Sequence, residues 1–190
     1  MHIYLVRHTH FFNPENIYPF HLDLYLSEEG REHAKRIGQW FAENKLQNLP
    51  IHTSPIIRCV QTAEIIASYI HAFVRIDQRL IETSCPNLQG KKIPLETPWI
   101  VEEDDESRES RSDILNRVLN AYKERVNEGK DCILVSHGDA LTILYYYLNS
   151  KKLPKYLWGP ENIENIINRG EIVNIELNGD KIHSISRIKV

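Results

Sequence analysis

Short apolar runs alternate along the chain with longer segments in which apolar residues recur every three or four positions. The runs have the length of strands and lie at 2–6, 50–54, 73–76 and 132–137. The periodic segments predict amphipathic helices at 27–44, 55–70 and 113–126, and an almost wholly apolar helix is expected from Gly138 to Leu148. Two of these segments begin with residues that favour a helix start, Ser27 as an N-cap and Pro55 at the first position.

This alternation of strands with helices predicts an α/β fold with a mainly parallel sheet. The last segments, 171–177 and 181–188, read instead as an antiparallel hairpin about Asn178-Gly179. Two stretches fit neither pattern. Residues 8–26 form a connection long enough to suggest a functional loop, and residues 82–108 are irregular, with several prolines and an acidic run.

Composition narrows the class of protein without changing this picture. The 190 residues suffice for one domain, 1–190, and 23 basic against 26 acidic side chains leave a formal charge of −3. We therefore expect no nucleic acid and no membrane as partner. The three cysteines are far apart and form no C-x-x-C, which is typical of reduced thiols in a cytoplasmic protein. A monomer and a homodimer are both left open.

Polar residues follow several of the predicted strands, at the point where each one ends. Arg7 and His8 end the first strand, and His137 ends the strand that begins at 132. Arg58 lies one helical turn beyond the second strand, and Glu82 follows the third. Because the carboxyl ends of parallel strands meet at one edge of a sheet, we expect these five side chains to converge.

The expected set of side chains has a specific chemistry. Two guanidiniums, an imidazole and a helix N-terminus form a pocket for a tetrahedral dianion such as phosphate. A histidine in that pocket is able to attack phosphorus, and a carboxyl group with a raised pKa is able to protonate the departing alcohol. These cations belong to the protein itself, so the chemistry needs no metal and no cofactor.

Motifs in this order resemble the histidine phosphatase superfamily, the phosphoglycerate mutase-like group. They are "LVRHT", "LSEEGREHAKRIG", "TSPIIRCVQTAEII", "RLIE", Glu109-Ser110 eight residues before Arg117-Val118, and "LVSHGDAL". The resemblance covers most of the chain, and a lone Arg-His pair would carry no weight without the other motifs. It implies a three-layer α/β/α sandwich and a phosphoric monoester hydrolase that acts on a small phosphorylated substrate.

The resemblance also implies a role for each matching residue. His8 would be the nucleophile that becomes phosphohistidine, and Arg7, Arg58 and His137 would bind the phosphoryl oxygens. Glu82 would be the general acid and then the base that activates water. These five residues form the expected catalytic set.

Further positions match the resemblance in part. Gly138 would let the backbone approach the pocket, and Thr9 stands where the family usually has glycine, beside the nucleophile. Asn13 lies one residue before the usual asparagine position, which is Pro14 here, so it is a candidate phosphate contact. His33 replaces the usual glutamine of the first helix.

Four alternatives to hydrolysis of a general phosphomonoester remain. A phosphoglycerate mutase must keep water from its phosphoenzyme, usually with longer insertions than this chain has. Thr9 also suggests an α-ribazole phosphatase-like enzyme. A metal-dependent hydrolase would use His8 and His10 as an H-x-H pair with His137 and Asp139. The last alternative is a phosphate-binding module without turnover.

We expect the other histidines, Cys85 and the tyrosine run to have no catalytic role. We expect a surface or pocket-rim position for His10, His21, His33 and His52, an inert thiol at Cys85, and a core position for the tyrosines 145–147. The acidic run 102–106 reads as a solvated loop. If it lies near the pocket entrance, it would repel polyanions and favour a monophosphate with a neutral or cationic remainder.

Overall fold

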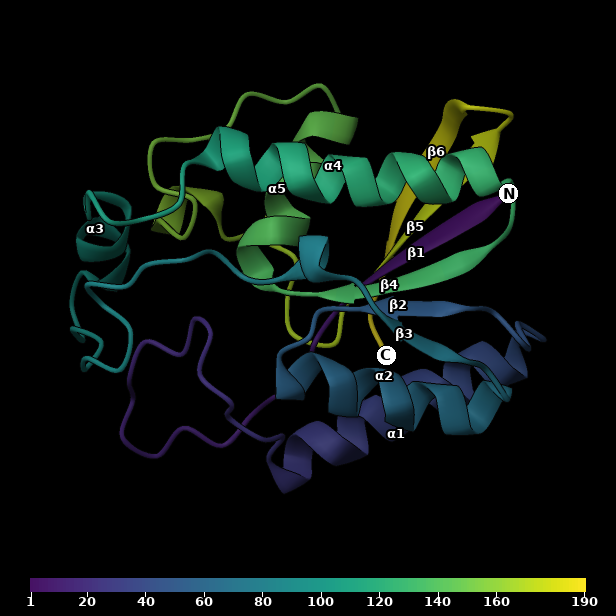
Figure 1. Ribbon diagram of the computed structural model, residues 1–190, viewed down its shortest axis with the longest axis horizontal. Helices are drawn as coiled ribbons and strands as arrows, with labels where there is room; N and C mark the ends of the chain where they lie inside the picture. The colour runs from purple at the N-terminus through teal and green to yellow at the C-terminus, as the bar shows by residue number, and fades with distance from the viewer.

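Six strands form one sheet in the order β3-β2-β4-β1-β5-β6 in the computed structural model, which describes residues 1–190 (Figure 1). The first four strands in this order are mutually parallel, and β5 and β6 run antiparallel to their neighbours. The strands are β1 (His2–Arg7), β2 (Ile51–Thr53), β3 (Val74–Ile76), β4 (Cys132–Ser136), β5 (Ile172–Asn178) and β6 (Lys181–Ile188). The predicted mainly parallel sheet with a terminal hairpin is thus confirmed.

Helices cover both faces of the sheet. In Figure 1, α1 (Glu28–Glu43) and α2 (Ile57–Ile70) lie on one side, and α4 (Arg111–Glu128) and α5 (Gly138–Leu148) lie on the other. The alternation of β1 explains the two cores, since Ile3 and Leu5 pack with α4 and α5 while Tyr4 and Val6 pack with α1 and α2. The fold is a three-layer α/β/α sandwich, as the family resemblance implied.

Local sequence signals set the ends of these helices. The Ser27 side chain accepts a hydrogen bond from the backbone N–H of Gly30 at the start of α1, at 3.1 Å. At the start of α4 the Ser110 side chain accepts one from Asp113 in the same way. Gly129 ends α4 at a φ of +65°, a left-handed conformation that glycine adopts without strain.

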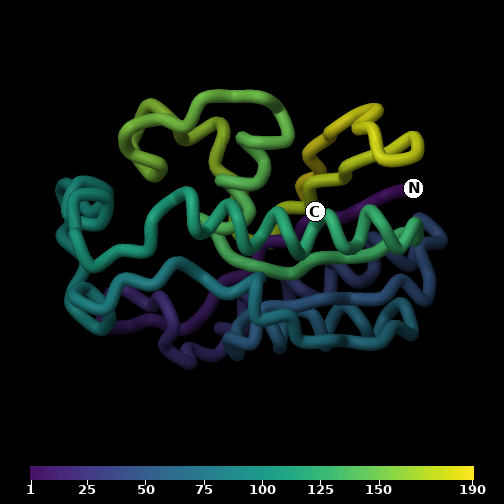
Figure 2. Tube along the Cα trace, turned by 45° about the horizontal axis from the view of Figure 1, so that its top comes forward, coloured from purple at the N-terminus to yellow at the C-terminus, as the bar shows by residue number.

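The two stretches without a clear pattern lie side by side at one end of the sheet (Figure 2). A bridge between Ile17 and Lys92 joins them, and a small apolar cluster of Tyr18, Phe20, Cys85 and Leu88 lies between them. The stretch predicted to be irregular also contains a short helix, α3 (Pro98–Glu103). Both stretches therefore form an ordered cover over the carboxyl ends of the parallel strands.

Two expectations about single side chains were wrong. His52, expected at the surface or a pocket rim, is buried because Arg125 of α4 covers it and places its Nη1 2.9 Å from the His52 Nε2. Tyr147, expected in the core, is exposed, whereas its neighbour Tyr146 is buried. The two side chains differ because successive residues of a helix point about 100° apart.

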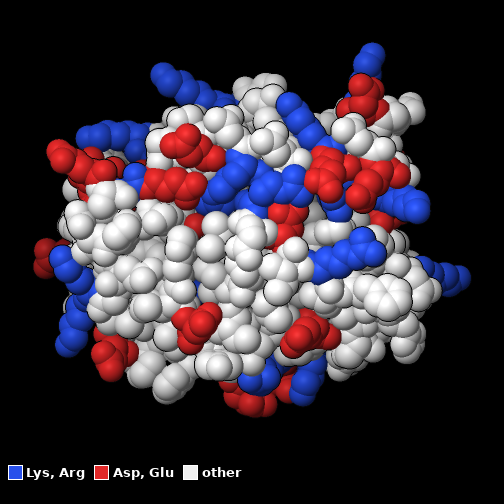
Figure 3. Space-filling view, in the orientation of Figure 1, with Lys and Arg blue, Asp and Glu red and all other residues white.

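The distribution of surface charge and the composition of the helices are relevant to nucleic-acid and membrane partners. On the face drawn in Figure 3, basic and acidic side chains lie interspersed over α4, with no extended patch of one sign. No helix has the length and apolar composition required to cross a membrane.

Candidate active site

Five polar side chains converge where the parallel strands end, as the strand order predicts. Arg7 ends β1 and His8 follows it, while His137 follows β4, the parallel neighbour of β1. Arg58 comes from the first turn of α2, and Glu82 comes from the segment after β3. The rings of His8 and His137 lie edge to face with centroids 5.2 Å apart.

His8 is buried and held in one tautomer. Its Nδ1 lies 2.8 Å from the backbone carbonyl of Thr9, which only accepts hydrogen bonds, so Nδ1 carries the proton and Nε2 has the lone pair. Burial, together with the positive charges of Arg58 and Arg7, lowers the pKa of His8 well below its ordinary value. The imidazole is therefore neutral at physiological pH, and its Nε2 is a competent nucleophile.

Arg58 is buried and held by the long loop that follows β1. Its Nη2 and Nη1 donate to the carbonyls of Phe20 and Leu22, at 2.7 and 3.1 Å. Its Nε donates to the His8 Nε2 at 3.3 Å. The loop thus orients a guanidinium directly beside the candidate nucleophile.

Arg7 packs between the loop before β5 and the start of α5. Its Nη1 donates to the carbonyl of Ile167 at 2.9 Å, while its buried Nε has no hydrogen-bond partner. Its guanidinium carbon lies 4.8 Å from the centre of the Trp158 ring. A Cβ on Gly138 would lie 2.5 Å from Trp158 and 3.0 Å from the Arg7 guanidinium carbon, so only glycine fits here.

His137 is the N-cap residue of α5 and is completely buried. Its Nε2 lies 2.7 Å from the Ser54 hydroxyl, and the sulfur of Cys59 lies 3.3 Å from the same nitrogen. Burial and the charge of Arg58 lower the pKa of His137 well below its ordinary value. This second imidazole is therefore neutral and held rigidly against the first.

Glu82 is the acidic side chain that lies beside His137. Its Oε1 accepts a hydrogen bond from the Thr83 N–H at 3.0 Å, and its Oε2 lies 3.9 Å from the His137 Nδ1. Burial, with a further contribution from the charge of Asp139, raises the pKa of Glu82 to about 7. A carboxyl group with this pKa is able both to give and to take a proton near neutral pH.

Asp139 and its partners were not part of the predicted site. Its carboxylate accepts hydrogen bonds from the Thr83 hydroxyl at 2.6 Å, the Trp158 indole N–H at 2.5 Å and the Arg108 Nη2 at 2.5 Å. It thereby ties α5 to the segment that carries Glu82. The sequence places Asp139 two residues after His137, but its use as a brace depends on partners far away in the chain.

Arg169 is a third guanidinium that the sequence analysis missed. The loop before β5 reaches the site because β5 pairs with β1, and the Gly170 N–H donates to the Arg7 carbonyl at 3.0 Å. Arg169 stacks on Phe11 at 4.6 Å, with Arg58 at 5.3 Å from the same ring, and no acidic group pairs with it. Burial and the charge of Arg58 lower the pKa of Arg169.

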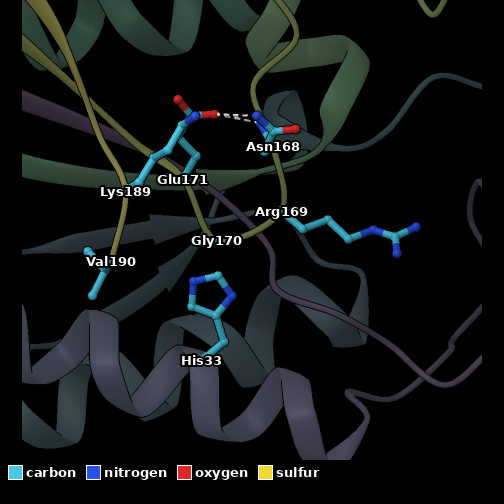
Figure 4. Close-up of a pocket in the computed structure, with 7 residues that line it drawn as sticks. All are labelled: His33, Asn168, Arg169, Gly170, Glu171, Lys189 and Val190. Carbon is cyan, nitrogen blue, oxygen red and sulfur yellow. Dashed lines mark hydrogen bonds between the residues drawn. The ribbon is translucent and has the colours of Figure 1, made fainter. Parts of the chain in front are cut away.

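The loop that carries Arg169 is fixed from its other side (Figure 4). Asn168 donates through its backbone N–H to the buried Glu171 carboxylate at 2.8 Å, and Gly170 has a φ of +73° with no room for a Cβ above His33. In Figure 4 the Arg169 side chain extends away from these groups. No local motif marks Arg169, because the pairing of β5 with β1 is what brings it to the site.

The side chains of Thr9 and Asn13, unlike the Thr9 carbonyl that holds His8, bond to neighbouring segments. Thr9 is buried with its hydroxyl 3.4 Å from that of Thr62 in α2. Both polar atoms of the Asn13 amide bond to the backbone of Ile17, at 2.9 and 3.2 Å. The geometry gives Thr9 a packing role and Asn13 a role in bracing the loop.

A cavity of about 350 Å³ opens outwards from Arg7 and Glu82. Its other lining residues come from the two stretches that lacked a pattern, from α5 and from the segment before β5, and they are Tyr18, Pro19, Phe20, Ile93, Pro98, Trp99, Glu102, Asp139, Trp158 and Arg169. A substrate whose phosphate lies at Arg7 therefore has room for its alcohol portion in this cavity.

Glu102 and Glu103 of the acidic run are not part of a solvated loop, which corrects the sequence interpretation for these two residues, whereas Asp104 and Glu106 are exposed. Glu102 and Glu103 belong to α3, and the Glu103 carboxylate is buried 2.5 Å from Arg111 and 3.1 Å from Arg108. Only Glu102 of the run lines the cavity. The run is ordered because its acids satisfy two buried or half-buried arginines.

The side chains of the H-x-H alternative do not converge. His10 lies beside His33, with ring centroids 6.5 Å apart, and Asp139 is saturated by its three donors. No group of three or more His, Cys, Asp or Glu side chains has the arrangement of a metal site. The set formed by His8, Glu82 and the guanidiniums instead suits the transfer of a phosphoryl group.

Comparison with known proteins identifies a family whose name agrees with this chemistry. The sequence profile of the histidine phosphatase superfamily (branch 1) matches residues 3–181. A phosphoglycerate mutase of Candida albicans is 36% identical over 91 residues, which cover 46% of this chain and 37% of that protein. The match therefore spans little more than a third of the curated relative.

Solved structures agree over nearly the whole chain. YhfR of Bacillus stearothermophilus superimposes with a TM-score of 0.81 at 26% identity, covering 96% of this chain and 94% of the other. A mycobacterial glucosyl-3-phosphoglycerate phosphatase gives 0.76 at 22% identity, with 98% and 96% covered. A protein of Escherichia coli described as a putative α-ribazole-5'-phosphate phosphatase gives 0.77 at 18% identity, with 100% and 96% covered. The last two show likeness of fold alone.

Proposed function

Because the chain belongs to the histidine phosphatase superfamily (branch 1), we propose that it hydrolyses small phosphomonoesters through a phosphohistidine on His8. The observation that carries the proposal is the neutral His8 ring, whose proton is fixed on Nδ1 and whose Nε2 faces the Arg58 guanidinium. Arg7, Arg58 and Arg169 supply the positive charge that a phosphate dianion requires.

In the first step the Nε2 lone pair of His8 attacks phosphorus, and the bond from phosphorus to the alcohol oxygen breaks. Glu82 gives its proton to that oxygen, so the leaving group departs as a neutral alcohol. The guanidiniums and an N–H of His137 bind the three equatorial phosphoryl oxygens, where charge accumulates in the transition state. The free Nε of Arg7 is one donor that this step would use.

In the second step the Glu82 carboxylate takes a proton from water, whose oxygen attacks the phosphohistidine. The bond from phosphorus to Nε2 breaks, and inorganic phosphate and neutral His8 are released. Glu82 ends protonated and ready for the next cycle. The pKa of Glu82, raised to about 7 by burial, suits both of its roles.

Trapping the phosphoenzyme tests this proposal. We expect wild-type protein mixed with a ³²P-labelled phosphomonoester and quenched with alkali to carry an acid-labile, alkali-stable label. The label and the release of phosphate should both disappear in His8→Ala, while His10→Ala keeps both. Turnover without any label on His8 would refute the proposed intermediate.

The same assay addresses the alternatives. A mutase would transfer the label to a second alcohol instead of to water, so adding 3-phosphoglycerate would slow the release of inorganic phosphate. A metal-dependent hydrolase would lose activity in EDTA, whereas the proposed enzyme keeps it. A binding module would bind the phosphomonoester and release no inorganic phosphate from it.

A further inference from the structure

The cavity beyond Glu82 has one wall made of aromatic ring faces. Tyr18 and Phe20 lie nearly parallel, with centroids 5.6 Å apart and planes 6° apart. The Tyr18 hydroxyl donates to the carbonyl of Pro98 at 2.9 Å, and the Trp158 N–H is used by Asp139. Tyr18 and Phe20 are almost wholly buried, so the aromatic surface open to the cavity comes mainly from the partly exposed Trp99 and Trp158.

An acidic cluster adjoins these aromatic side chains, and its charge is not fully balanced. Three carboxyl groups (Glu102, Glu103 and Asp139) share two guanidiniums, those of Arg108 and Arg111. Glu103 and Asp139 have the shorter contacts, at 2.5 Å each.

Glu102 is the member of this group that lacks a close partner. Its one ion-pair contact is a 3.2 Å approach to Arg108, which Glu103 and Asp139 also contact. Burial, with the charge of Asp139, raises the pKa of Glu102 well above its ordinary value. A donor from a ligand would supply the partner that the protein does not, because a buried carboxylate is stabilised by hydrogen bonds and positive charge.

The cavity therefore presents both signs of charge. Arg7 and Arg169 lie where the phosphate would bind, and Asp139 is next to Arg7 at the start of α5. Glu102 lines the same cavity from α3. A ligand that brings its phosphate to the guanidiniums and a donor or cation to Glu102 would match both.

We propose that the substrate of this site is the phosphomonoester of an alcohol that carries an aromatic ring and, beyond the ring, a cationic or N–H-donating group. The ring would lie against Trp99, and the donor would reach Glu102. An alcohol portion that carries a carboxylate or a second phosphate would meet Glu102 and be disfavoured. This assignment rests on the proposed phosphatase function.

Three aryl phosphates with a cationic, a neutral or an anionic substituent at the same ring position test the role of Glu102 and the acidic cluster around it. They are 4-(2-aminoethyl)phenyl phosphate, 4-ethylphenyl phosphate and 3-(4-phosphonooxyphenyl)propanoate. We expect kcat/KM to decrease in that order, with at least about a tenfold span between the cation and the anion at low salt. The leaving phenols are alike, so the span reports the cavity and not the chemical step.

Two variants separate Glu102 from the general charge of the acidic run. Glu102→Gln should reduce the ratio of kcat/KM between the cationic and anionic substrates to near one. Glu106→Gln removes the same charge from an exposed member of the run and should leave the span unchanged. Equal effects of the two substitutions, or no span in the wild-type protein, would overturn the assignment to Glu102.

The aromatic wall has its own comparison. We expect 2-phenylethyl phosphate to exceed butyl phosphate in kcat/KM by roughly tenfold, or about 1.4 kcal/mol, because the ring gains contacts with aromatic side chains that a butyl chain does not. Trp99→Ala should lower this ratio without changing the preference for the cationic aryl phosphate over the anionic one. A ratio near one in the wild-type protein would overturn this part.

Binding of non-hydrolysable phosphonates distinguishes failure of this inference from failure of the proposed function. The probes are the phosphonate analogues of the same three aryl phosphates, measured by calorimetry on the wild-type protein. A protein that prefers the cationic phosphonate but hydrolyses none of the phosphates supports the cavity assignment and refutes the phosphatase. A protein that hydrolyses all three phosphates equally and binds the phosphonates equally does the reverse.

Discussion

The hydrogen bonds and burial of single side chains set the protonation states of His8 and Glu82. The Nδ1 of His8 is committed to a backbone carbonyl, which leaves Nε2 for attack. Glu82 has the complementary property, because burial keeps a proton on it near neutral pH. The site thus combines a histidine whose pKa is lowered with a glutamate whose pKa is raised. At one pH the histidine is therefore free of its second proton while the glutamate is able to donate one.

The role of Glu82 predicts how rate depends on pH and on the leaving group. For an alkyl phosphate, whose alcohol needs a proton, kcat/KM should fall above pH 7 as Glu82 loses its proton. Glu82→Gln should reduce that rate by roughly 10² to 10⁴. With 4-nitrophenyl phosphate, whose leaving group needs little protonation, both effects should be much smaller. Steady-state kinetics from pH 5 to 9 measures this, and equal losses on the two substrates would contradict a general-acid role.

Arg169 should contribute to phosphoryl binding although it lies far from the recognised motifs. We expect Arg169→Met to lower kcat/KM by roughly 10- to 100-fold, the value of a charge-assisted hydrogen bond, and to weaken vanadate binding in parallel. Lys189→Met removes an equal charge on the other side of the same loop and serves as control (Figure 4). A loss confined to thermal stability would mean that Arg169 only supports the loop.

At the scale of elements, the site depends on how closely α5 approaches β1. The helix begins at Gly138, and its first turn lies against the side chains of Arg7 and Trp158. The long loop after β1 meets the site from the other side, where its carbonyls hold Arg58. The phosphate pocket is thus assembled from one helix start and one irregular loop, each fixed by the sheet.

Gly138→Ala tests this close approach. The new methyl group would lie 2.5 Å from Trp158, so we expect a loss of about 1 to 3 kcal/mol in unfolding free energy from overpacking. The activity should fall further, because Arg7 must move. The double variant Gly138→Ala/Trp158→Leu should recover stability in urea unfolding. A stable, fully active single variant would show that α5 has room to shift.

At the scale of the whole molecule, the active site makes folding depend on pH. Glu82 has a higher pKa in the folded chain than in the unfolded one, so the folded chain binds more protons between pH 4.5 and about 7. Stability from this residue is therefore present below the unfolded pKa and is lost as pH rises through the folded one. The buried Glu171, whose pKa is lowered mainly by its hydrogen bonds with Arg187 against the effect of burial, acts in the opposite sense in acid.

Glu82→Gln should consequently stabilise the protein in mild alkali. One pKa unit corresponds to about 1.4 kcal/mol, so the rise from 4.5 to about 7 allows a gain of up to about 3 kcal/mol above pH 7. Below pH 4.5 the charge effect vanishes, since Glu82 is then protonated in both states. Urea unfolding at pH 4.5, 6 and 8 measures the difference, and parallel pH profiles for the two proteins would contradict it.

The sequence alone determined the strands, the four long flanking helices and the polar residues at the strand ends. These follow from local rules: hydrophobic period, Ser27 as a cap, the Asn178-Gly179 turn, and the convergence of parallel strand ends that brings Arg7 and His137 together. Motif order added the expected roles, including that of Glu82.

Only the tertiary structure decided which side chains complete the pocket. Arg169 arrives because β5 pairs antiparallel with β1, a strand order that no local pattern encodes. Glu102 is a cavity wall instead of a solvated acid because Arg108 draws α3 inwards, and Asn13 braces its own loop because Ile17 lies within reach. Each of these outcomes depends on a partner distant in the chain or on the path of a loop, and neither leaves a periodic signal in the sequence.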